Sequence, residues 1–355
     1  MNRLPLPPGL RADYVLEGQF FAWPLAVSGE CEPIDPDSAR VCAVAPAADG
    51  RMVWGATDGE TCHVFAARLK GAAGGVMDLG TVPDAASVPA VLPIPAGHPL
   101  AKGPYSALAL AWMDPGWELW RWQAPAPADS VQEPGYGHAV PELLARGLHQ
   151  DVHGLALIGE QPVVWADGCV LAVEADGCLL ELADLLAPPA CSPVRLGDVY
   201  WWLKEDGALA GLGLDASLCL PDLVVPLPGK SATLCAWGDT LLAAADGMLY
   251  DIDPAAGSVE AFAYTPLPAV QCLAGLPDGR AYGVCGHGIG HVFRVDREPA
   301  QCVALGAAAT AVGHHRYGFE FSGASVSAEG VIFLGEHDRG GHLWAYYPPL
   351  SMSRA

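Results

Sequence analysis

A pattern that recurs along the chain constrains the fold more than any other feature, and Tyr317 to Pro348 is its clearest copy. The segment reads YGFEFSGASVSAEGVIFLGEHDRGGHLWAYYP. It contains an apolar run, a small polar turn that ends in Glu329-Gly330, a β-branched and aromatic run, a charged loop and a third apolar run. Short runs of this composition separated by Gly-containing turns predict a three-strand meander.

The same order of runs and turns recurs at Arg40 to Leu69 and at Val270 to Asp296. Weaker copies lie between them, and one turn glycine marks each copy: Gly50, Gly116, Gly168, Gly197, Gly238, Gly279 and Gly330. A repeat of roughly 40 residues built from short strands is typical of a β-propeller, because one small sheet buries both faces only when neighbouring sheets stack on it. The pattern therefore predicts an all-β, seven-bladed β-propeller. The uneven spacing leaves six or eight blades open, and an irregular β-sandwich is the alternative fold.

The domain organisation follows from the same repeat. The seventh copy lacks a fourth strand before the chain ends, whereas the strand-like run Tyr14 to Ala26 precedes the first copy. We expect this N-terminal segment to supply the missing strand and close the ring, which removes its free edges. Residues 1–355 are therefore predicted to form a single propeller domain. The Pro- and Gly-rich segment at about 124–150 interrupts the repeat and is interpreted as an insertion, a binding loop or a solvated loop, with one helical turn at Pro141 to Arg146.

Charge and cysteine content narrow the class of protein. The formal net charge is -22, from 40 acidic and 18 basic residues. A field of this sign repels phosphate backbones and anionic lipid surfaces, so we expect neither nucleic-acid nor membrane binding. The eleven cysteines include no Cys-x-x-Cys pair and mostly lie in apolar runs, which favours reduced, structural thiols. With no signal-peptide pattern and no run of membrane-spanning length, a cytoplasmic protein is predicted.

Polar side chains gather in one class of loop. In a propeller, the loop that enters each innermost strand and the loop that joins the second and third strands open onto the same face. This geometry groups the following residues: His149, Asp151, His153, His287, His314, His315, Arg316, Tyr317, Glu336, His337, Asp338 and Arg339. A local excess of His, Arg and Tyr on an acidic chain predicts a site for a small anionic or sugar-like ligand. The structural alternative is that the backbone satisfies these strand-entry residues.

The combination of residue types suggests a reaction class. His, Tyr and Arg at one channel mouth supply an acid, a base and a group that neutralises a carboxylate. Together they suit abstraction of a proton next to a carboxylate. A separate set, His63, His291 and His342, begins third strands, and we expect each of these to bond its own blade's loop rather than to bind a metal.

The D-G turn, the aromatic strand and the H-[VL]-[FW] start of the third run resemble the seven-bladed propellers that include bacterial polysaccharide, oligosaccharide and streptogramin lyases. The resemblance covers most of the chain as a blade pattern and matches no family-specific signature. It implies a carbon–oxygen lyase acting on a carbohydrate-type substrate, with His153, His315 and Tyr317 as acid or base. Four further residues are assigned to substrate binding: His149, Arg316, His337 and Arg339. The sequence contains no sialidase box, no series of WD dipeptides and no C-x-x-C-H haem site.

Two other functions stay open. The first is a non-enzymatic ring that binds a protein or a small ligand on the same face. The second is a metal-dependent hydrolase or lactonase that uses His314 or His315, His337, and Asp338 or Glu336, so a divalent metal remains open as a cofactor. A recessed polar cluster favours an enzyme, whereas a flat polar rim favours a scaffold.

Overall fold

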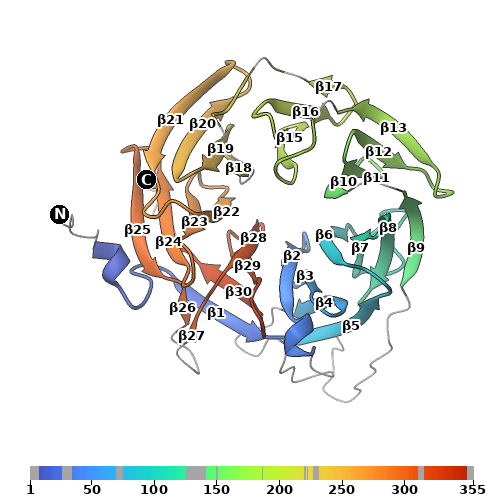
Figure 1. Cartoon of the computed structure of the whole chain (residues 1–355), viewed down its shortest axis with the longest axis horizontal. Helices are drawn as coiled ribbons and strands as arrows, with labels where there is room; N and C mark the ends of the chain where they lie inside the picture. The colour runs from blue at the N-terminus through green and yellow to red at the C-terminus, as the bar shows by residue number, and fades with distance from the viewer. Residues whose placement is uncertain are drawn as a thin grey trace.

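The computed structural model describes residues 8–25, 34–68, 75–124, 141–148, 151–185, 187–219, 221, 223–226, 232–310 and 316–349. These residues form seven antiparallel sheets of four strands each, arranged in a ring (Figure 1). In six sheets the strands follow one another in chain order from the centre outward, and in the seventh the outermost strand comes from the N-terminal end. The chain is a seven-bladed β-propeller. The all-β prediction and the seven-blade count are confirmed.

The strands are short and occupy four positions in each blade. The innermost strands are β2 (Arg40–Pro46), β6 (Ser87–Ile94), β10 (Val152–Ile158), β14 (Val194–Leu196), β18 (Ala232–Trp237), β22 (Val270–Gly275) and β28 (Phe321–Val326). The second strands are β3 (Met52–Asp58), β7 (Ser106–Met113), β11 (Gln161–Ala166), β15 (Val199–Leu203), β19 (Thr240–Ala245), β23 (Ala281–Cys285) and β29 (Ile332–Glu336). The third strands are β4 (Cys62–Arg68), β8 (Gly116–Gln123), β12 (Cys169–Val173), β16 (Leu209–Gly213), β20 (Met248–Asp253), β24 (His291–Asp296) and β30 (His342–Tyr347). The outermost strands are β5 (Val76–Val82), β9 (Glu142–Gly147), β13 (Leu179–Asp184), β17 (Leu218–Cys219), β21 (Ser258–Tyr264), β25 (Gln301–Ala307) and β1 (Gln19–Pro24).

The apolar core is divided among the contacts between blades. Successive side chains of a strand point to opposite faces of its sheet, and here both faces are covered. In β3, Trp54 packs with Trp122 of blade 2, whereas the preceding Val53 packs with Leu343 of blade 7. Seven such clusters are present among the described residues, one between each pair of neighbouring blades. Every blade therefore depends on two neighbours for burial, which explains why the ring must close.

The N-terminal strand closes the ring. Strand β1 pairs antiparallel with β30, from Gln19 opposite Tyr347 to Pro24 opposite His342. Phe20 is buried in the cluster between blades 6 and 7, where its ring packs against the aromatic rings of β30. The predicted closure by the segment Tyr14 to Ala26 is confirmed, and the regular strand occupies the middle of that segment.

Part of the expected insertion is regular structure. The helical turn predicted at Pro141 to Arg146 is wrong, because Glu142–Gly147 is strand β9, the outermost strand of blade 2. Its residues have good helix propensity, but pairing with β8 and burial of Ala145 against the sheet outweigh that preference. Residues 125–140 lie outside the described residues.

Two of the seven turn glycines belong to a different turn class. Gly116 is the first residue of the third strand of blade 2 and Gly168 lies between the second and third strands of blade 3, whereas the other five lie between first and second strands. In blades 2 and 3 the first turns are instead residues 95–105 and 159–160. This difference explains the long and short intervals between the glycines. Each blade still contributes one of the seven glycines, so the count was correct.

Few elements of the described chain lie outside the seven blades. They include the 3-10 helices η1 (Pro8–Arg11) and η2 (Pro36–Ser38), and a two-strand hairpin of β26 (Ala309–Thr310) and β27 (Arg316–Tyr317) between blades 6 and 7. None of the described helices has the length and apolar character needed to cross a membrane.

Candidate functional site

The predicted site falls on the face that carries the loops entering the innermost strands and the loops between second and third strands, which we call the entry face. At blade 7 this face is organised around Glu336, the last residue of β29, whose side chain is fully buried. Its carboxylate accepts hydrogen bonds from the backbone N–H of Phe319 at 3.0 Å, from Arg316 Nη2 at 3.1 Å and from Trp344 Nε1 at 3.2 Å. The Nδ1 atom of His342 lies 3.0 Å from the same carboxylate.

These contacts keep Glu336 ionised inside the blade. Burial raises the pKa of its carboxyl, but the contact with His342, the Phe319 N–H and the charge of Arg316 outweigh burial and lower the pKa below its usual value. Three hydrogen bonds and the nearby His342 thus engage this buried carboxylate within the blade. Its role at this position is to hold the entry loop and the start of β30 together.

Ion pairs join the blade 7 loop to blade 1. His337 Nε2 lies 2.9 Å from Asp58 Oδ2 at the end of β3, and this contact raises the pKa of His337 above its usual value of 6.5 against the opposing effect of partial burial. Arg339 Nε lies 2.6 Å from Asp37 Oδ1 in η2. Both predicted ligand-binding cations are therefore paired with carboxylates of the neighbouring blade.

Blade 3 contains a separate pair on the entry face. His153 of β10 places Nε2 2.5 Å from Oδ1 of Asp167, in the turn between β11 and β12, and both side chains are partly exposed. The His153 carbonyl accepts a hydrogen bond from Ser192 Oγ at 2.9 Å, which ties it to the segment leading into blade 4. A half-exposed histidine oriented by a carboxylate has the geometry of a general base.

The predicted site residues are brought together only in part. Arg316 and the Glu336–Arg339 loop meet in blade 7, whereas His153 lies in blade 3, with blades 1 and 2 between them along the ring. Tyr317 lies in β27, where it pairs with Ala309. Three predicted residues lie outside the described residues: His149, His314 and His315.

The three histidines that begin third strands contact their own blades. His63 lies 3.0 Å from Asp78 and 3.0 Å from Thr61, and Nδ1 of His291 lies 3.0 Å from the Ile289 carbonyl. His342 contacts Glu336, as described above. In the described part of the chain, no group of three His, Cys, Asp or Glu side chains has an arrangement that could hold a metal ion.

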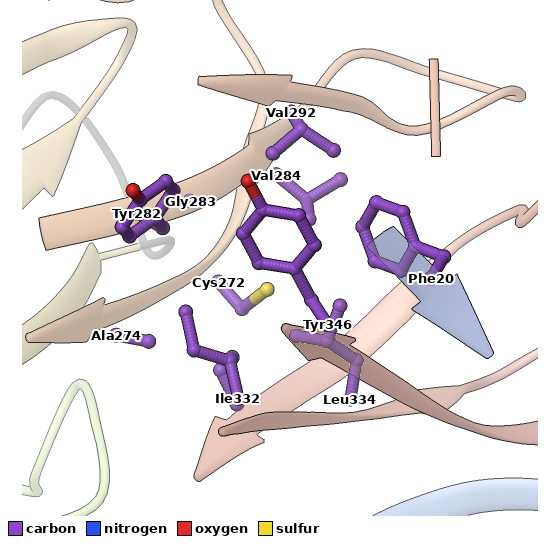
Figure 2. Close-up of a pocket in the computed structure, with 11 residues that line it drawn as sticks. Phe20, Cys272, Ala274, Tyr282, Gly283, Val284, Val292, Ile332, Leu334 and Tyr346 are labelled. Atoms are coloured by element: carbon purple, nitrogen blue, oxygen red, sulfur yellow. The ribbon is translucent and has the colours of Figure 1, made fainter. Parts of the chain in front are cut away.

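An apolar void lies between blades 6 and 7 (Figure 2). Phe20, Tyr282 and Tyr346 line it with aliphatic side chains of β22, β23 and β29. Its volume of about 10 Å³ is the size of one water molecule at most. This void is a packing gap of the core and has no room for a ligand.

The opposite face, which we call the turn face, carries the turns between first and second strands and has an open groove. One part, of about 360 Å³, is lined by the turns of blades 5, 6 and 7, including Gly238, Pro277 and Ala328. A second part, of about 210 Å³, shares Leu276, Pro277 and Ala328 with the first and continues outward to Pro348 and Pro349. Because the two parts share lining residues, they form one continuous groove, the turn-face groove.

An exposed carboxylate stands in the first turn of six of the seven blades. These six residues, the acidic ring, are Asp49, Glu160, Asp198, Asp239, Asp278 and Glu329. Asp278 binds Arg280 at 2.6 Å, and Asp239 lies 3.2 Å from Arg297. Within the described residues, the side-chain carboxylates of Glu160, Asp198 and Glu329 have no hydrogen-bond or ion-pair partner. The rim around the turn-face groove is therefore negatively charged.

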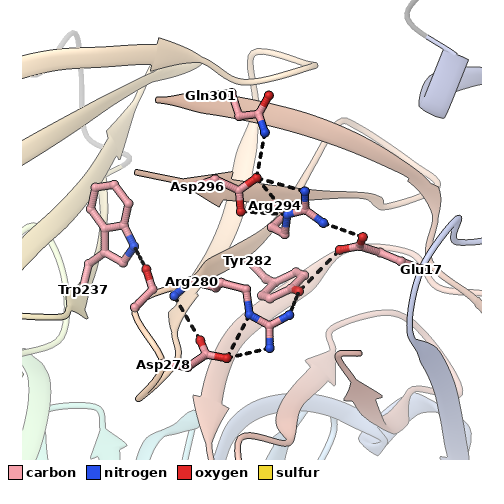
Figure 3. Close-up of polar contacts among 9 residues, drawn as sticks. Glu17, Trp237, Asp278, Arg280, Tyr282, Arg294, Asp296 and Gln301 are labelled. Carbon is pink, nitrogen blue, oxygen red and sulfur yellow. Dashed lines mark hydrogen bonds and ion pairs between the residues drawn. The ribbon is translucent and has the colours of Figure 1, made fainter. Parts of the chain in front are cut away.

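A polar network fixes the blade 6 wall of the groove (Figure 3). Arg280 donates to Asp278 from Nε at 2.9 Å and to the Tyr282 hydroxyl at 3.0 Å. The indole Nε1 of Trp237 donates to the Gly279 carbonyl at 2.7 Å, which ties the turn of blade 6 to blade 5. Arg294 pairs with Asp296 and with Glu17 of the N-terminal segment. The groove wall is thus held in place from three sides.

Comparisons with solved structures identify the fold. The chain is similar to U3-55K, with a TM-score of 0.60 and 11% sequence identity over 93% of this chain and 98% of that chain. It is equally similar to the WD40 β-propeller domain of Doa1, with a TM-score of 0.60 and 13% identity over 94% of this chain and all of that one. No protein-family model matches the sequence. No curated protein matches it either. At such low identity, the likeness concerns the propeller fold alone.

Neither the carboxylates that pair with the entry-face cations nor the acidic ring was predicted from the sequence. The signal for the ring was present, because an Asp or Glu stands beside the turn glycine in each of these six blades, as in Asp49-Gly50 and Glu329-Gly330. Asp58 and Asp167 each precede a glycine as well, but no local pattern shows that Asp37 and Asp58 contact blade 7 from a neighbouring blade. Their contacts depend on how blades meet across the ring.

Proposed function

We propose that this propeller is a non-enzymatic ring that binds a partner protein. The observation that carries the proposal is the pairing of four entry-face cations with carboxylates, His153 and Arg316 within their own blades and His337 and Arg339 with blade 1. An anionic substrate needs cationic groups whose charge is not already neutralised. These pairs leave none among the four.

The cost of freeing such a cation supports the same proposal. Arg316 is paired with the fully buried Glu336, and removing one partner of a buried pair leaves an uncompensated charge at a cost of about 3 kcal/mol or more. A ligand that recruited Arg316 would have to offset this loss. Surface recognition requires no such rearrangement, and the ring offers an open groove on its other face.

A lyase is the second candidate, and the pair His153–Asp167 favours it. The carboxylate orients a half-exposed imidazole, as required of a general base. In this alternative, His153 removes a proton next to a substrate carboxylate, and Tyr317 and His315 remain candidates for the general acid. Arg316, His337 and Arg339, after leaving their present partners, would bind the substrate carboxylate together with His149.

One experiment separates the two candidates. Purified full-length protein is incubated with a panel of uronate-containing oligosaccharides, with and without divalent cations, and the ultraviolet absorbance of the unsaturated product is followed. A binding ring gives no product, and the His153→Ala variant captures its protein partner at the same stoichiometry in native mass spectrometry. Turnover that falls by roughly 10²–10⁴ in His153→Ala or Tyr317→Phe would establish the lyase instead.

A further inference from the structure

We propose that the turn-face groove binds a basic, extended segment of the partner protein, with Arg or Lys side chains against the acidic ring. This inference rests on the proposed function, because it names the surface and the chemistry of that partner. The surface lies opposite the face that carries the His, Arg and Tyr residues. The groove joins three consecutive blades, so it is a product of the ring and not of one repeat.

The shape of the groove suits a main chain more than a bulky compact ligand. Its floor and walls come from small or rigid residues, including Gly238, Gly275 and Ala328 and the prolines Pro277 and Pro348. Side chains of this size leave a shallow channel that runs from the inner end of blade 5 outward between blades 6 and 7. The combined volume is in the range of pockets that hold small ligands or short peptide segments. A rigid wall costs little conformational entropy on binding.

The negative charge around the groove favours a partner segment with positive side chains. Glu329 lines the outer part with an exposed carboxylate that has no partner among the described residues, and Asp239 follows Gly238 on the inner part. Arg280, the cation of the lining, is neutralised by Asp278. A segment with positive side chains therefore meets complementary charge at Glu329 in the outer part of the groove and at Asp239 in the inner part, whose pair with Arg297 is exposed to solvent.

The same charges exclude other occupants. A second copy of this chain has a net charge of -22 and meets like charge at the groove, which costs several kcal/mol where charges are juxtaposed. Nucleic acid is repelled by the same field. A basic segment is in addition drawn to the ring over a distance, since a strongly negative surface raises association rates by about 10–10³ at low ionic strength.

Binding of a defined probe tests the inference. The probe is a fluorescein-labelled peptide of alternating arginine and alanine, and its anisotropy is measured against full-length protein over a series of salt concentrations. We expect saturable binding that weakens as salt rises, because the contacts are partly exposed. Glu329→Gln should weaken binding about two- to fivefold, as expected for an exposed ion pair. Ala328→Arg fills the groove and adds a positive charge that repels the arginines of the probe, so it should weaken peptide binding by at least about tenfold.

A matched control distinguishes the groove from the overall charge. Glu181→Gln removes the same single charge from an exposed position on the outermost strand of blade 3 and should leave binding unchanged. Equal weakening by Glu181→Gln and Glu329→Gln, or full binding by Ala328→Arg, would overturn the groove as the site. Circular dichroism confirms that each variant is folded. If the protein turns over oligosaccharides while the groove variants still weaken peptide binding, the proposed non-enzymatic function is wrong but the groove remains a binding site. If the wild type and Ala328→Arg bind a protein partner equally well, the proposed function stands but the groove is not the binding site.

Discussion

At the scale of single residues, the structure depends on buried charge that is fully paired. Glu336 has no solvent exposure, and it is held by Phe319, Trp344, Arg316 and His342. Such a pair adds little stability compared with an apolar core, but breaking it is costly because the remaining charge stays buried. The entry face is therefore sensitive to loss of either partner.

Replacing Glu336 with Gln should lower the free energy of unfolding by about 3 kcal/mol, because Arg316 and His342 lose the carboxylate that neutralises them. We expect a loss at the lower end of the range for broken buried pairs, because Arg316 is partly exposed to solvent. Urea denaturation measures the change. Glu320→Gln is the matched control, an exposed carboxylate of the same entry loop, and should change stability by less than about 0.5 kcal/mol. Equal effects of the two variants would contradict the assigned role.

The pair His337–Asp58 should make stability depend on pH near neutrality. The folded pKa of His337 is raised above 6.5, so the folded state binds the proton more tightly than the unfolded state. Its contribution is present below pH 6.5 and is lost as pH rises through the higher folded pKa. The variant His337→Asn should lose this component, so the difference in unfolding free energy from the wild type should shrink as pH rises. A constant difference across this window would count against the pair.

The residue types of the candidate site could be predicted, but their partners could not. The positions of His153, Arg316, His337 and Arg339 on one face follow from strand order alone. Their neutralisation by carboxylates does not, because Asp58 and Asp37 reach blade 7 from another blade across a contact that no local pattern encodes.

At the scale of elements, strand β1 decides whether the ring is closed. It covers the edge of β30, and Glu17, just before it, pairs with Arg294 of blade 6 while the Tyr346 hydroxyl donates to the Glu17 carbonyl at 2.9 Å. The last blade is thus joined to the start of the chain by backbone pairing, aromatic packing and an ion pair. Each of these contacts spans nearly the full length of the sequence.

Truncation of residues 1–26 should leave β30 with an unpaired edge and expose the cluster around Trp344. We expect the truncated protein to aggregate and to melt at a lower temperature, as measured by light scattering and calorimetry. In the full chain, Phe20→Ala should cost about 3–5 kcal/mol, the range for truncating a buried aromatic side chain. Its neighbour Phe21 is only partly buried and provides the control. A monomeric truncated protein with an unchanged melting temperature would disprove this closure.

Secondary structure was predicted correctly where a copy of the repeat is well preserved. The prediction failed where pairing with a neighbouring strand determines the conformation of a segment. The copies at blades 1, 6 and 7 show the expected turns, with positive φ at Gly50, Gly279 and Gly330. In blades 2 and 3 the first turns also contain a glycine with positive φ, Gly97 and Gly159, but neither directly follows an Asp or Glu as in blades 1, 6 and 7, so the sequence pattern points to the next turn instead. The residues of strand β9 predict a helical turn, because its pairing with β8 is not encoded in its own sequence.

At the scale of the whole molecule, the ring distributes burial over seven contacts between blades. Aromatic and aliphatic side chains fill these contacts, and cysteine is among the smaller residues there. Nine of the described cysteines are shown to be free, and burial raises the pKa of several, to about 11 for Cys62 and about 12 for Cys235 and Cys272. Thiols of this kind are mostly protonated near neutral pH and react slowly.

Thiol counting should therefore find all eleven cysteines reduced under denaturing, non-reducing conditions. In the native protein, the exposed Cys178 should react first, and the buried thiols only as the ring opens. The rate of labelling against denaturant concentration measures this order. Several paired cysteines in the denatured protein would contradict both the structural role of the thiols and the predicted reducing compartment.

The central claim is that the ring binds a protein partner and that four of its entry-face cations, His153, Arg316, His337 and Arg339, are already paired and do not bind an anionic substrate. Isothermal titration calorimetry of the full-length protein with a short oligogalacturonate tests it most directly. The account predicts no affinity tighter than about 1 mM, because His153, Arg316, His337 and Arg339 are each paired with a carboxylate. Micromolar binding that Arg316→Ala or Arg339→Ala weakens by about 1.5–3 kcal/mol would contradict it and return the entry face to a substrate site.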